Sequence, residues 1–405
     1  MLLIIGAGSV AQVAAVASAK AITASKHEPV FSNITVASRT LDKCYRVKDA
    51  VLAKTSLEIG IEKVNADDKK AVVALIKKCK ATVLLNLALP YQDLVLMDAC
   101  LEAKIPYIDT ANYEHPDEAK FEYKEQWARH ESFKKAGLMA LLGAGFDPGV
   151  TNVFCAYAQQ KLFDEIQYID ILDCNAGSHG YAFATNFNPE INLREVSANG
   201  RYWEEGQWIE TQPLEYMCEW DYPRIGPRDS YLLYHEELES LSKNIKGLKR
   251  IRFFMTFSKS YITHMNCLQN VGMLGIAPVN HKGVEIVPME FLKTLLPDPA
   301  TLGPRTKGKT NIGTVIHGLK DGKSKSVYIY NVCDHQECYK ATGIGAVGYT
   351  TGVPAAIAAQ LVGSGTWSGE GVFNIEEMNA EPFMKALNEQ GLSWHIEENR
   401  ELAQI

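Results

Sequence analysis

The first twenty residues, MLLIIGAGSVAQVAAVASAK, constrain the fold more than any other stretch of the chain. Residues 2–5 form a continuous apolar run, as expected of a strand buried on both faces. A G-x-G-x-x-A turn follows at residues 6–11, and small apolar residues then recur at helical spacing. The glycines of such a turn let the backbone approach a pyrophosphate, which the helix N-terminus favours as an anion. This stretch therefore predicts a dinucleotide site, with a ligand-free glycine turn as the alternative.

The end of the second predicted strand indicates which dinucleotide binds. Residues 34–37 are apolar and β-branched, and Ser38, Arg39 and Thr40 follow them. An NAD-binding fold usually has an acidic residue here, which accepts hydrogen bonds from the ribose hydroxyls. A guanidinium can instead bond a 2′-phosphate bidentately, and two hydroxyls can donate to the same group. The sequence therefore predicts NADP(H), the alternative being a polar loop in solvent.

Strands and helices continue to alternate through residue 148, and a long helix is expected over residues 116–136. Repeated βαβ units imply a parallel, doubly wound sheet, with ligands bound at the carboxyl ends of the strands. Those ends lie at residues 38–40, 86–88, 109–112 and 143–147, which should surround one crevice with the glycine turn. The expected cofactor-binding residues are Gly6, Gly8, Ser9, Val10, Ala11, Ser38, Arg39, Thr40, Asp67, Asn86, Leu87, Ala88, Thr110, Gly145 and Phe146.

Beyond Gly149 the pattern changes from βαβ units to successive strands, which we expect at residues 167–174, 251–258 and 261–273. Asp321 and Gly322, between two alternating runs, are a strong hairpin signal. The predicted fold class is α/β: a Rossmann-type doubly wound parallel sheet with an inserted α+β domain built on an antiparallel or mixed sheet. Residues 1–148 with 341–405 should form the NADP-binding domain. Residues 149–340 should bind substrate and form a homodimer.

Length, charge and cysteine content exclude several classes of protein. A chain of 405 residues is too long for one compact core. Its net charge is −7, and no block of Lys and Arg stands out, so nucleic acid and membranes are not expected partners. The N-terminal apolar run stops at Gly6, too early for a signal peptide or a membrane span. Nine Cys residues in a chain without an export signal are expected to be free thiols in the cytoplasm. The expected partners are small molecules.

Longer stretches resemble the saccharopine dehydrogenase family: GAGSVA, ASRT, NLALPYQDLVLMDACLEAKIPYIDTANYE and LGAGFDPGVTNVF. More narrowly, the last of these, residues 173–201 and CYKATGIGAVGYTTGVPAA resemble the carboxynorspermidine (carboxyspermidine) dehydrogenases. The resemblance covers nearly the whole chain, with residues 284–309 contributing little. It implies NADPH-dependent reduction of the Schiff base of L-aspartate 4-semialdehyde and a diamine, 1,3-diaminopropane or putrescine. The implied product is carboxynorspermidine or carboxyspermidine, in polyamine biosynthesis.

Two other functions remain open. A saccharopine reductase-type enzyme would join glutamate to 2-aminoadipate semialdehyde, and that substrate's three carboxylates should require more basic residues than residues 177–222 offer. A non-catalytic NADP-binding regulator would keep the fold without turnover, although it would not need an elaborate second domain.

Imine formation and reduction need a group that moves a proton. Asp147 is the first candidate, because it follows the last parallel strand and should face the crevice. Asp-Pro is also a good helix start, so Asp147 can equally be the N-cap of a helix running through Val153. His317 is the second candidate, since imidazole titrates near neutral pH, and His335 is a weaker one. Residues 333–338 lack a second ligand pair, so no metal site is predicted.

The substrate should be recognised through its charged groups. A carboxylate is best held by arginine, for which Arg194 and Arg201 are the candidates. An amine calls for carboxylates and aromatic faces, which residues 203–208 and 219–222 combine. We place Trp203 with the substrate-binding residues on this ground.

Overall fold

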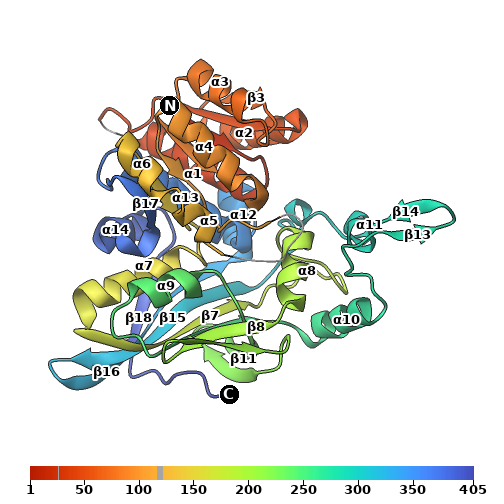
Figure 1. Ribbon diagram of the computed structural model, residues 1–405, viewed down its shortest axis with the longest axis vertical. Helices are drawn as coiled ribbons and strands as arrows, with labels where there is room; N and C mark the ends of the chain where they lie inside the picture. The colour runs from red at the N-terminus through yellow and green to blue at the C-terminus, as the bar shows by residue number, and fades with distance from the viewer. Residues whose placement is uncertain (26, 116–121) are drawn as a thin grey trace.

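The computed structural model describes residues 1–25, 27–115 and 122–405, which form two sheet-based domains and a projecting arm (Figure 1). Within these residues, seven parallel strands form the first sheet in the order β17-β6-β5-β4-β1-β2-β3. The strands are β1 (Leu2–Ile5), β2 (Ile34–Ser38), β3 (Gly60–Lys63), β4 (Val83–Asn86), β5 (Tyr107–Ile108), β6 (Met139–Leu142) and β17 (Gly371–Asn374). Their helices are α1 (Ser9–Ala24), α2 (Leu41–Thr55), α3 (Lys69–Cys79), α4 (Asp93–Ala103), α5 (Lys124–Trp127) and α6 (His130–Ala136).

The predicted doubly wound sheet is confirmed, and the alternation of side chains along β1 explains its two covered faces. Leu2 and Ile4 point into one hydrophobic cluster with residues of α1 and α2. Leu3 and Ile5 point to the opposite face, into a second cluster with residues of α3, α4 and α6. The expected helix over residues 116–136 is two short helices from residue 124 onward, and residues 116–121 lie outside the described part.

The second sheet is mixed, as predicted, with the strand path β10-β11-β12-β7-β15-β16-β18 and with β8 and β9 attached to β12. Strands β7 and β12 run parallel, and the other neighbours are antiparallel. The predicted hairpin is confirmed, because Asp321 and Gly322 join β15 and β16 with positive φ angles of 50° and 71°. The strands are β7 (Glu165–Asn175), β8 (Gly200–Glu204), β9 (Gln207–Thr211), β10 (Met217–Tyr222), β11 (Gly226–Leu233), β12 (Arg250–Thr256), β15 (Lys309–Lys320), β16 (Lys323–Asp334) and β18 (Trp394–Glu398).

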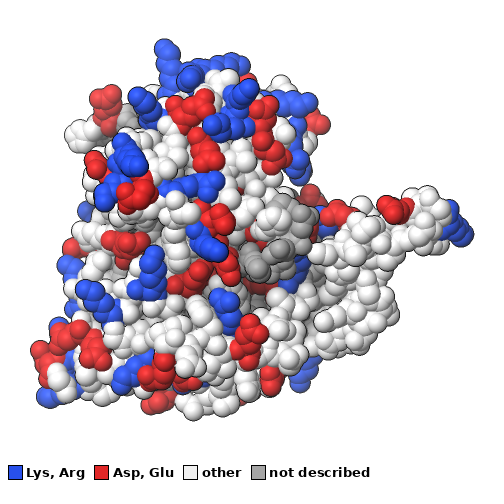
Figure 2. Space-filling view, viewed as in Figure 1, with Lys and Arg blue, Asp and Glu red and all other residues white. Residues whose placement is uncertain are grey.

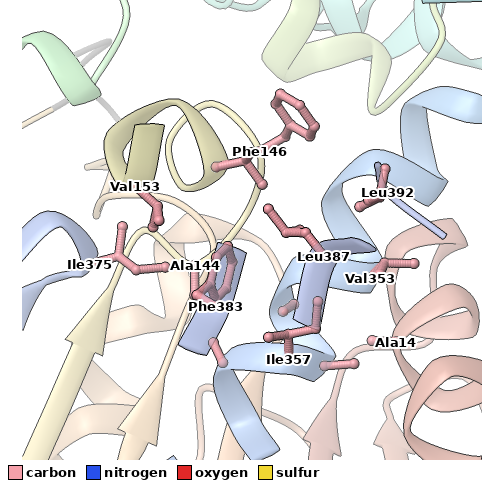
Figure 3. Packing of buried hydrophobic residues seen from close by; sticks show 14 of the residues in the cluster. Ala14, Ala144, Phe146, Val153, Val353, Ile357, Ile375, Phe383, Leu387 and Leu392 are labelled. Atoms are coloured by element: carbon pink, nitrogen blue, oxygen red, sulfur yellow. The ribbon is translucent and has the colours of Figure 1, made fainter. Parts of the chain in front are cut away.

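After α12 (His335–Thr342) the chain returns to the first domain through α13 (Ala346–Gly363), β17 and α14 (Ala380–Glu389). Helix α13 packs closely on α1, since a Cβ at Gly352 would lie 2.6 Å from the Cβ of Val13. Figure 3 shows Ile357 and Val353 of α13 in the same buried cluster as Ala14 of α1 and Leu387 of α14. Residues 341–405, all predicted to belong to the NADP-binding domain, are nevertheless divided between the two domains, because β18 pairs with β16 in the second sheet.

The projecting arm contains α10 (Lys259–Asn270), α11 (Pro288–Leu295) and a small sheet of β13 (Val279–His281) and β14 (Val284–Ile286) (Figure 1). The prediction of a strand over residues 261–273 is therefore wrong: Ser258 caps α10 by accepting a hydrogen bond from the Tyr261 N–H. Figure 2 shows charges of both signs mixed over the first domain, whereas the arm is mostly uncharged. No helix in the described residues has the length and apolar character needed to cross a membrane.

Candidate active site

The two domains meet around a cavity of about 360 Å³. The first domain contributes the start of α1, the strand ends at Thr110 and Asp147, and the first turn of α13. The second contributes the end of β7, helix α8 (Pro189–Ser197), the segment before α9 (Glu237–Asn244) and the start of α10. Its lining includes Ser9, Val10, Thr110, Asn112, Asp147, Asp173, Asn175, Phe187, Ile191, Asn192, Glu195, Tyr234, His235, Glu236, Phe257, Tyr261, Val347 and Thr351. Of the strand ends predicted to surround one crevice, residues 9–10, 110–112 and 147 line this cavity, and residues 38–40 and 86–88 do not.

The glycine turn at one side of the cavity fits a pyrophosphate. Gly6 has a φ of 114°, and any Cβ there would overlap the Leu87 carbonyl, so only glycine is accommodated. No atom lies within 4 Å of where a Cβ of Gly8 would be, which leaves room for a ligand against the backbone. Gly8 caps α1 without a side-chain hydrogen bond, and the first turn holds no acidic residue. The N–H groups of α1 are therefore available to an anion, while Ala11 is buried against the sheet.

The residues after β2 suit the 2′-phosphate of NADP(H). Arg39 is exposed, and within the described part of the chain it has neither a hydrogen bond nor an ion pair. Thr40 donates its backbone N–H to the Ser38 hydroxyl at 3.2 Å, which shapes the loop. Asp67 lies on the surface and accepts a hydrogen bond from Gln92. The carboxylate of Asp67, a predicted cofactor-binding residue, is therefore hydrogen-bonded within the protein by the Gln92 amide.

The remaining cofactor candidates divide between the cavity and the core. Thr110 lines the cavity, and Gly145 packs beside it, where a Cβ would lie 3.2 Å from the Thr110 carbonyl oxygen. Asn86 is buried, and its amide donates to Asp93 at 2.7 Å while its oxygen accepts the N–H of Ala88, so it fixes the loop through Leu87. The placement of Phe146 contradicts a cofactor role for its side chain, which is buried in the apolar cluster shown in Figure 3.

Asp147 lies in the cavity beside Asp173, which is close to the carboxyl end of β7. The capping alternative for Asp147 is wrong, because α7 (Val150–Tyr157) has Gly149 as its N-cap. Burial and the neighbouring Asp173 carboxylate raise the pKa of Asp147 well above its usual range, and burial raises the pKa of Asp173 to about 6. Two buried carboxyls in contact cannot both ionise easily. Asp147 therefore holds a proton near neutral pH and donates it toward Asp173.

His235 supplies the positive charge in this cluster. Its Nδ1 is hydrogen-bonded to Glu237, its Nε2 lies 3.4 Å from Glu195 Oε1, and its ring stacks on Phe253. Although burial acts in the opposite direction, the Glu237 and Glu195 carboxylates raise the pKa of His235 well above its usual range. The side chain is thus an imidazolium at neutral pH, placed among carboxylates by three different segments.

His335 has a different role from a proton carrier. Burial lowers its pKa to about 4, so the ring is neutral. Its Nδ1 accepts the Ala346 N–H at 3.2 Å, which leaves Nε2 to donate to Asn175 Oδ1 at 2.9 Å. The ring therefore ties the start of α13 to the end of β7 at the cavity wall.

The structure does not bring the predicted substrate-binding residues to the cavity. Arg194 is buried in an ion pair with Glu114 at 2.8 Å. The Arg201 guanidinium lies over the rings of both Trp208 and Tyr234, at 4.1 and 4.5 Å from their centroids. Trp203 packs on the core beside the same segment.

His317 also lies away from the cavity. Its Nε2 donates to the Arg400 carbonyl oxygen at 2.7 Å, which is a structural contact. Ile312 of the same strand lines the cavity, and five residues of extended chain span about 17 Å. Of the two candidate proton carriers, Asp147 lines the cavity and His317 does not.

Sequence reasoning missed the acidic lining of the second domain, Asp173, Glu195 and Glu236, together with His235. Burial raises the pKa of Glu195 to about 7 and that of Glu236 to about 8. Among the described residues that line the cavity there is no Lys or Arg. The one available signal was the polar Asp173 at the end of an apolar strand, ILDC, in residues 171–174. Within the described chain, no group of three or more His, Cys, Asp and Glu side chains has an arrangement that could hold a metal ion.

The amino-acid sequence of this chain matches two family models and several known proteins. A family model described as the saccharopine dehydrogenase NADP binding domain matches residues 2–141, and one described as the saccharopine dehydrogenase C-terminal domain matches residues 145–392. Carboxyaminopropylagmatine dehydrogenase of Synechocystis sp. is 55% identical over 365 residues, covering 90% of this chain and 91% of that protein.

Two other relatives are less similar but cover more of the chain. They are the carboxynorspermidine synthases of Vibrio alginolyticus, 40% identical, and Vibrio cholerae, 41% identical, and each alignment covers 97% of this chain and 96% of the relative. In structure, the apo saccharopine dehydrogenase (L-Glu forming) of Saccharomyces cerevisiae has a TM-score of 0.72 at 14% identity, over 98% of this chain and 99% of that one.

Proposed function

The chain belongs to the saccharopine dehydrogenase family, and on this premise we propose that it reduces the imine of L-aspartate 4-semialdehyde and a cationic amine. The family resemblance seen in the sequence is confirmed. The prediction that the chain is an NADP-dependent oxidoreductase is confirmed as well. The observation that carries the proposal is the lining of the cavity, where Asp147, Asp173, Glu195 and Glu236 gather without a Lys or Arg among the described residues. Such a lining attracts cations and repels polycarboxylates.

The relatives' names suggest which amine reacts. A carboxyaminopropyl group is what reductive addition of aspartate semialdehyde leaves on an amine, and the 55% identical relative is named for its agmatine derivative. We therefore propose agmatine as the first amine. The two relatives near 40% identity are named for carboxynorspermidine, so 1,3-diaminopropane, with putrescine as its homologue, is the second candidate. Either reaction would belong to polyamine biosynthesis.

The glycine turn, the open backbone at Gly8 and the unpaired Arg39 fit NADPH, which supplies the hydride when bound. Loss of water from the amine–aldehyde adduct needs a proton on the departing hydroxyl, and the imine accepts hydride best when its nitrogen is protonated. Asp147 holds a proton at neutral pH and lies in the cavity, so it can protonate the departing hydroxyl. Loss of water then leaves an imine whose nitrogen keeps its own proton, and Asp173 accepts the hydrogen bond that orients Asp147.

The same acidic cavity argues against the saccharopine reductase alternative. Glutamate and 2-aminoadipate semialdehyde bring three carboxylates to a lining in which the described residues include no Lys or Arg to pair with them. Unlike charges favour binding in a cavity of low dielectric constant, and like charges oppose it. Agmatine and the diamines carry the complementary charge.

The test is NADPH oxidation with aspartate semialdehyde and agmatine, 1,3-diaminopropane or putrescine, with mass spectrometry of the product. We expect turnover with agmatine above that with the diamines, and none with glutamate and 2-aminoadipate semialdehyde. Tight NADPH binding without turnover of any aldehyde and amine pair would instead support the non-catalytic regulator.

A further inference from the structure

Glu195, on α8, has a buried carboxyl group whose Oε1 accepts no hydrogen bond from the described residues. Its side chain is 10% exposed, it lines the cavity, and no described donor makes a hydrogen bond of good geometry to Oε1. The nearest described cation is His235, whose Nε2 lies 3.4 Å from Glu195 Oε1 without making a hydrogen bond of good geometry, while its Nδ1 is bonded to Glu237. A buried carboxylate oxygen with only this ion-pair contact can still accept a hydrogen bond from a donor that enters the cavity.

Aromatic faces stand beside this carboxylate. Phe257 and Tyr261 line the same cavity and stack with their ring centroids 5.1 Å apart. The Tyr261 hydroxyl donates to Asn192 Oδ1 at 2.6 Å and so holds α10 against α8. A carboxylate with aromatic walls is the surrounding that binds an ammonium or guanidinium group, because the ring faces are negative.

The position of α8 indicates which end of the amine substrate, the reacting end or the far cationic end, contacts Glu195. Asp147 follows β6 and lies on the first-domain side, near the dinucleotide turn. Figure 1 shows α8 and α10 beside the second sheet, apart from α1, so Glu195 enters the cavity from the second domain. We propose that Glu195 is a specificity-determining residue that binds the cationic group at the far end of the amine while Asp147 serves the reacting end. This inference rests on the proposed function.

The test compares Glu195→Gln with the wild type on two amines. One is agmatine or putrescine, and the other is butylamine, which has the reacting amine but no second cation. Removing one charge-assisted contact should raise the Michaelis constant for the cationic amine about tenfold to a hundredfold. The constants for butylamine and NADPH should stay unchanged, so the variant should lose its discrimination between the two amines. Glu190→Gln is the matched control, since Glu190 lies on the same helix, pairs with Lys293 and does not line the cavity.

Two further measurements keep the inference separate from the proposed function. Calorimetric titration of the NADPH complex with agmatine, without aldehyde, measures cation binding even if no turnover is found with any pair. Glu195→Asp keeps the charge and should retain part of the affinity, which guards against a folding defect in Glu195→Gln. Equal losses with butylamine and the cationic amine, or agmatine binding that is unchanged in Glu195→Gln, would overturn the role of Glu195.

Discussion

Replacing Asp147 by Asn should make the protein more stable and much less active. Asn has nearly the same shape but neither gives up a proton nor acquires a charge. A positioned acid contributes roughly 10²–10⁴-fold to such a step, so kcat should fall by this factor, or about 3–5 kcal/mol in activation free energy. NADPH affinity should not change, since the phosphate-binding features lie at the glycine turn and at Arg39.

The stability effect has a definite sign and pH dependence. Burial and the Asp173 carboxylate raise the pKa of Asp147, so above its unfolded value the native state holds a proton that the unfolded chain has lost. Native stability then falls by about 1.4 kcal/mol per pH unit for this one proton. Asp147→Asn removes that loss, so its free energy of unfolding relative to the wild type should rise with pH above the unfolded-state pKa of an aspartate.

Urea unfolding at several pH values measures this difference, and single-turnover NADPH oxidation measures the chemical step. Asp147→Glu, which keeps the acid but lengthens the side chain, is the companion variant and should recover part of the activity. A stability difference that is flat with pH would mean that Asp147 is ionised in the native state. Turnover near the wild-type rate in Asp147→Asn would remove it as the proton donor.

Four other changes test the remaining parts of the structure. Arg39→Ala should raise the Michaelis constant for NADPH about tenfold to a hundredfold and leave that for NADH unchanged; equal effects on both would exclude a 2′-phosphate contact. Gly6→Ala forces a side chain against the Leu87 carbonyl at a φ of 114°, so it should lower the melting temperature and abolish NADPH binding; a stable, NADPH-binding variant would contradict this backbone geometry. His317→Gln should keep full activity and lose about 1 kcal/mol of stability, and reduced kcat would return His317 to the site. Agmatine binding should weaken as pH falls below about 7, where Glu195 gains a proton, and pH-independent binding between pH 5 and 8 would contradict this.

Local sequence signals predicted the parts of the fold whose cause is local. The glycine turn and the Asp321-Gly322 hairpin depend on backbone angles that few residues adopt, so the residue types reveal them. The prediction of a strand over residues 261–273 was wrong because it relied on the β-branched and aromatic residues there and ignored Ser258, which caps a helix. The cap was readable in the sequence.

The charged side chains that line the cavity could not be predicted in the same way. Asp173, Glu195 and His235 come from a strand, a helix and a loop that only the tertiary fold brings together. Arg194 and Arg201 have the residue type expected of carboxylate ligands, yet an internal carboxylate and two aromatic rings already occupy their guanidinium groups. A residue's chemistry can be read from the sequence, whereas its availability depends on its neighbours.

The division of the C-terminal segment has a consequence for synthesis on the ribosome. β17 completes the edge of the first sheet, and β18 completes the second, where Ala403 also bonds Asp170 and Arg252. α13 buries the face of α1 that a shorter nascent chain would expose to water. Neither domain can therefore finish folding before residues beyond 370 have emerged from the exit tunnel, so the two domains must mature together after most of the chain has been made.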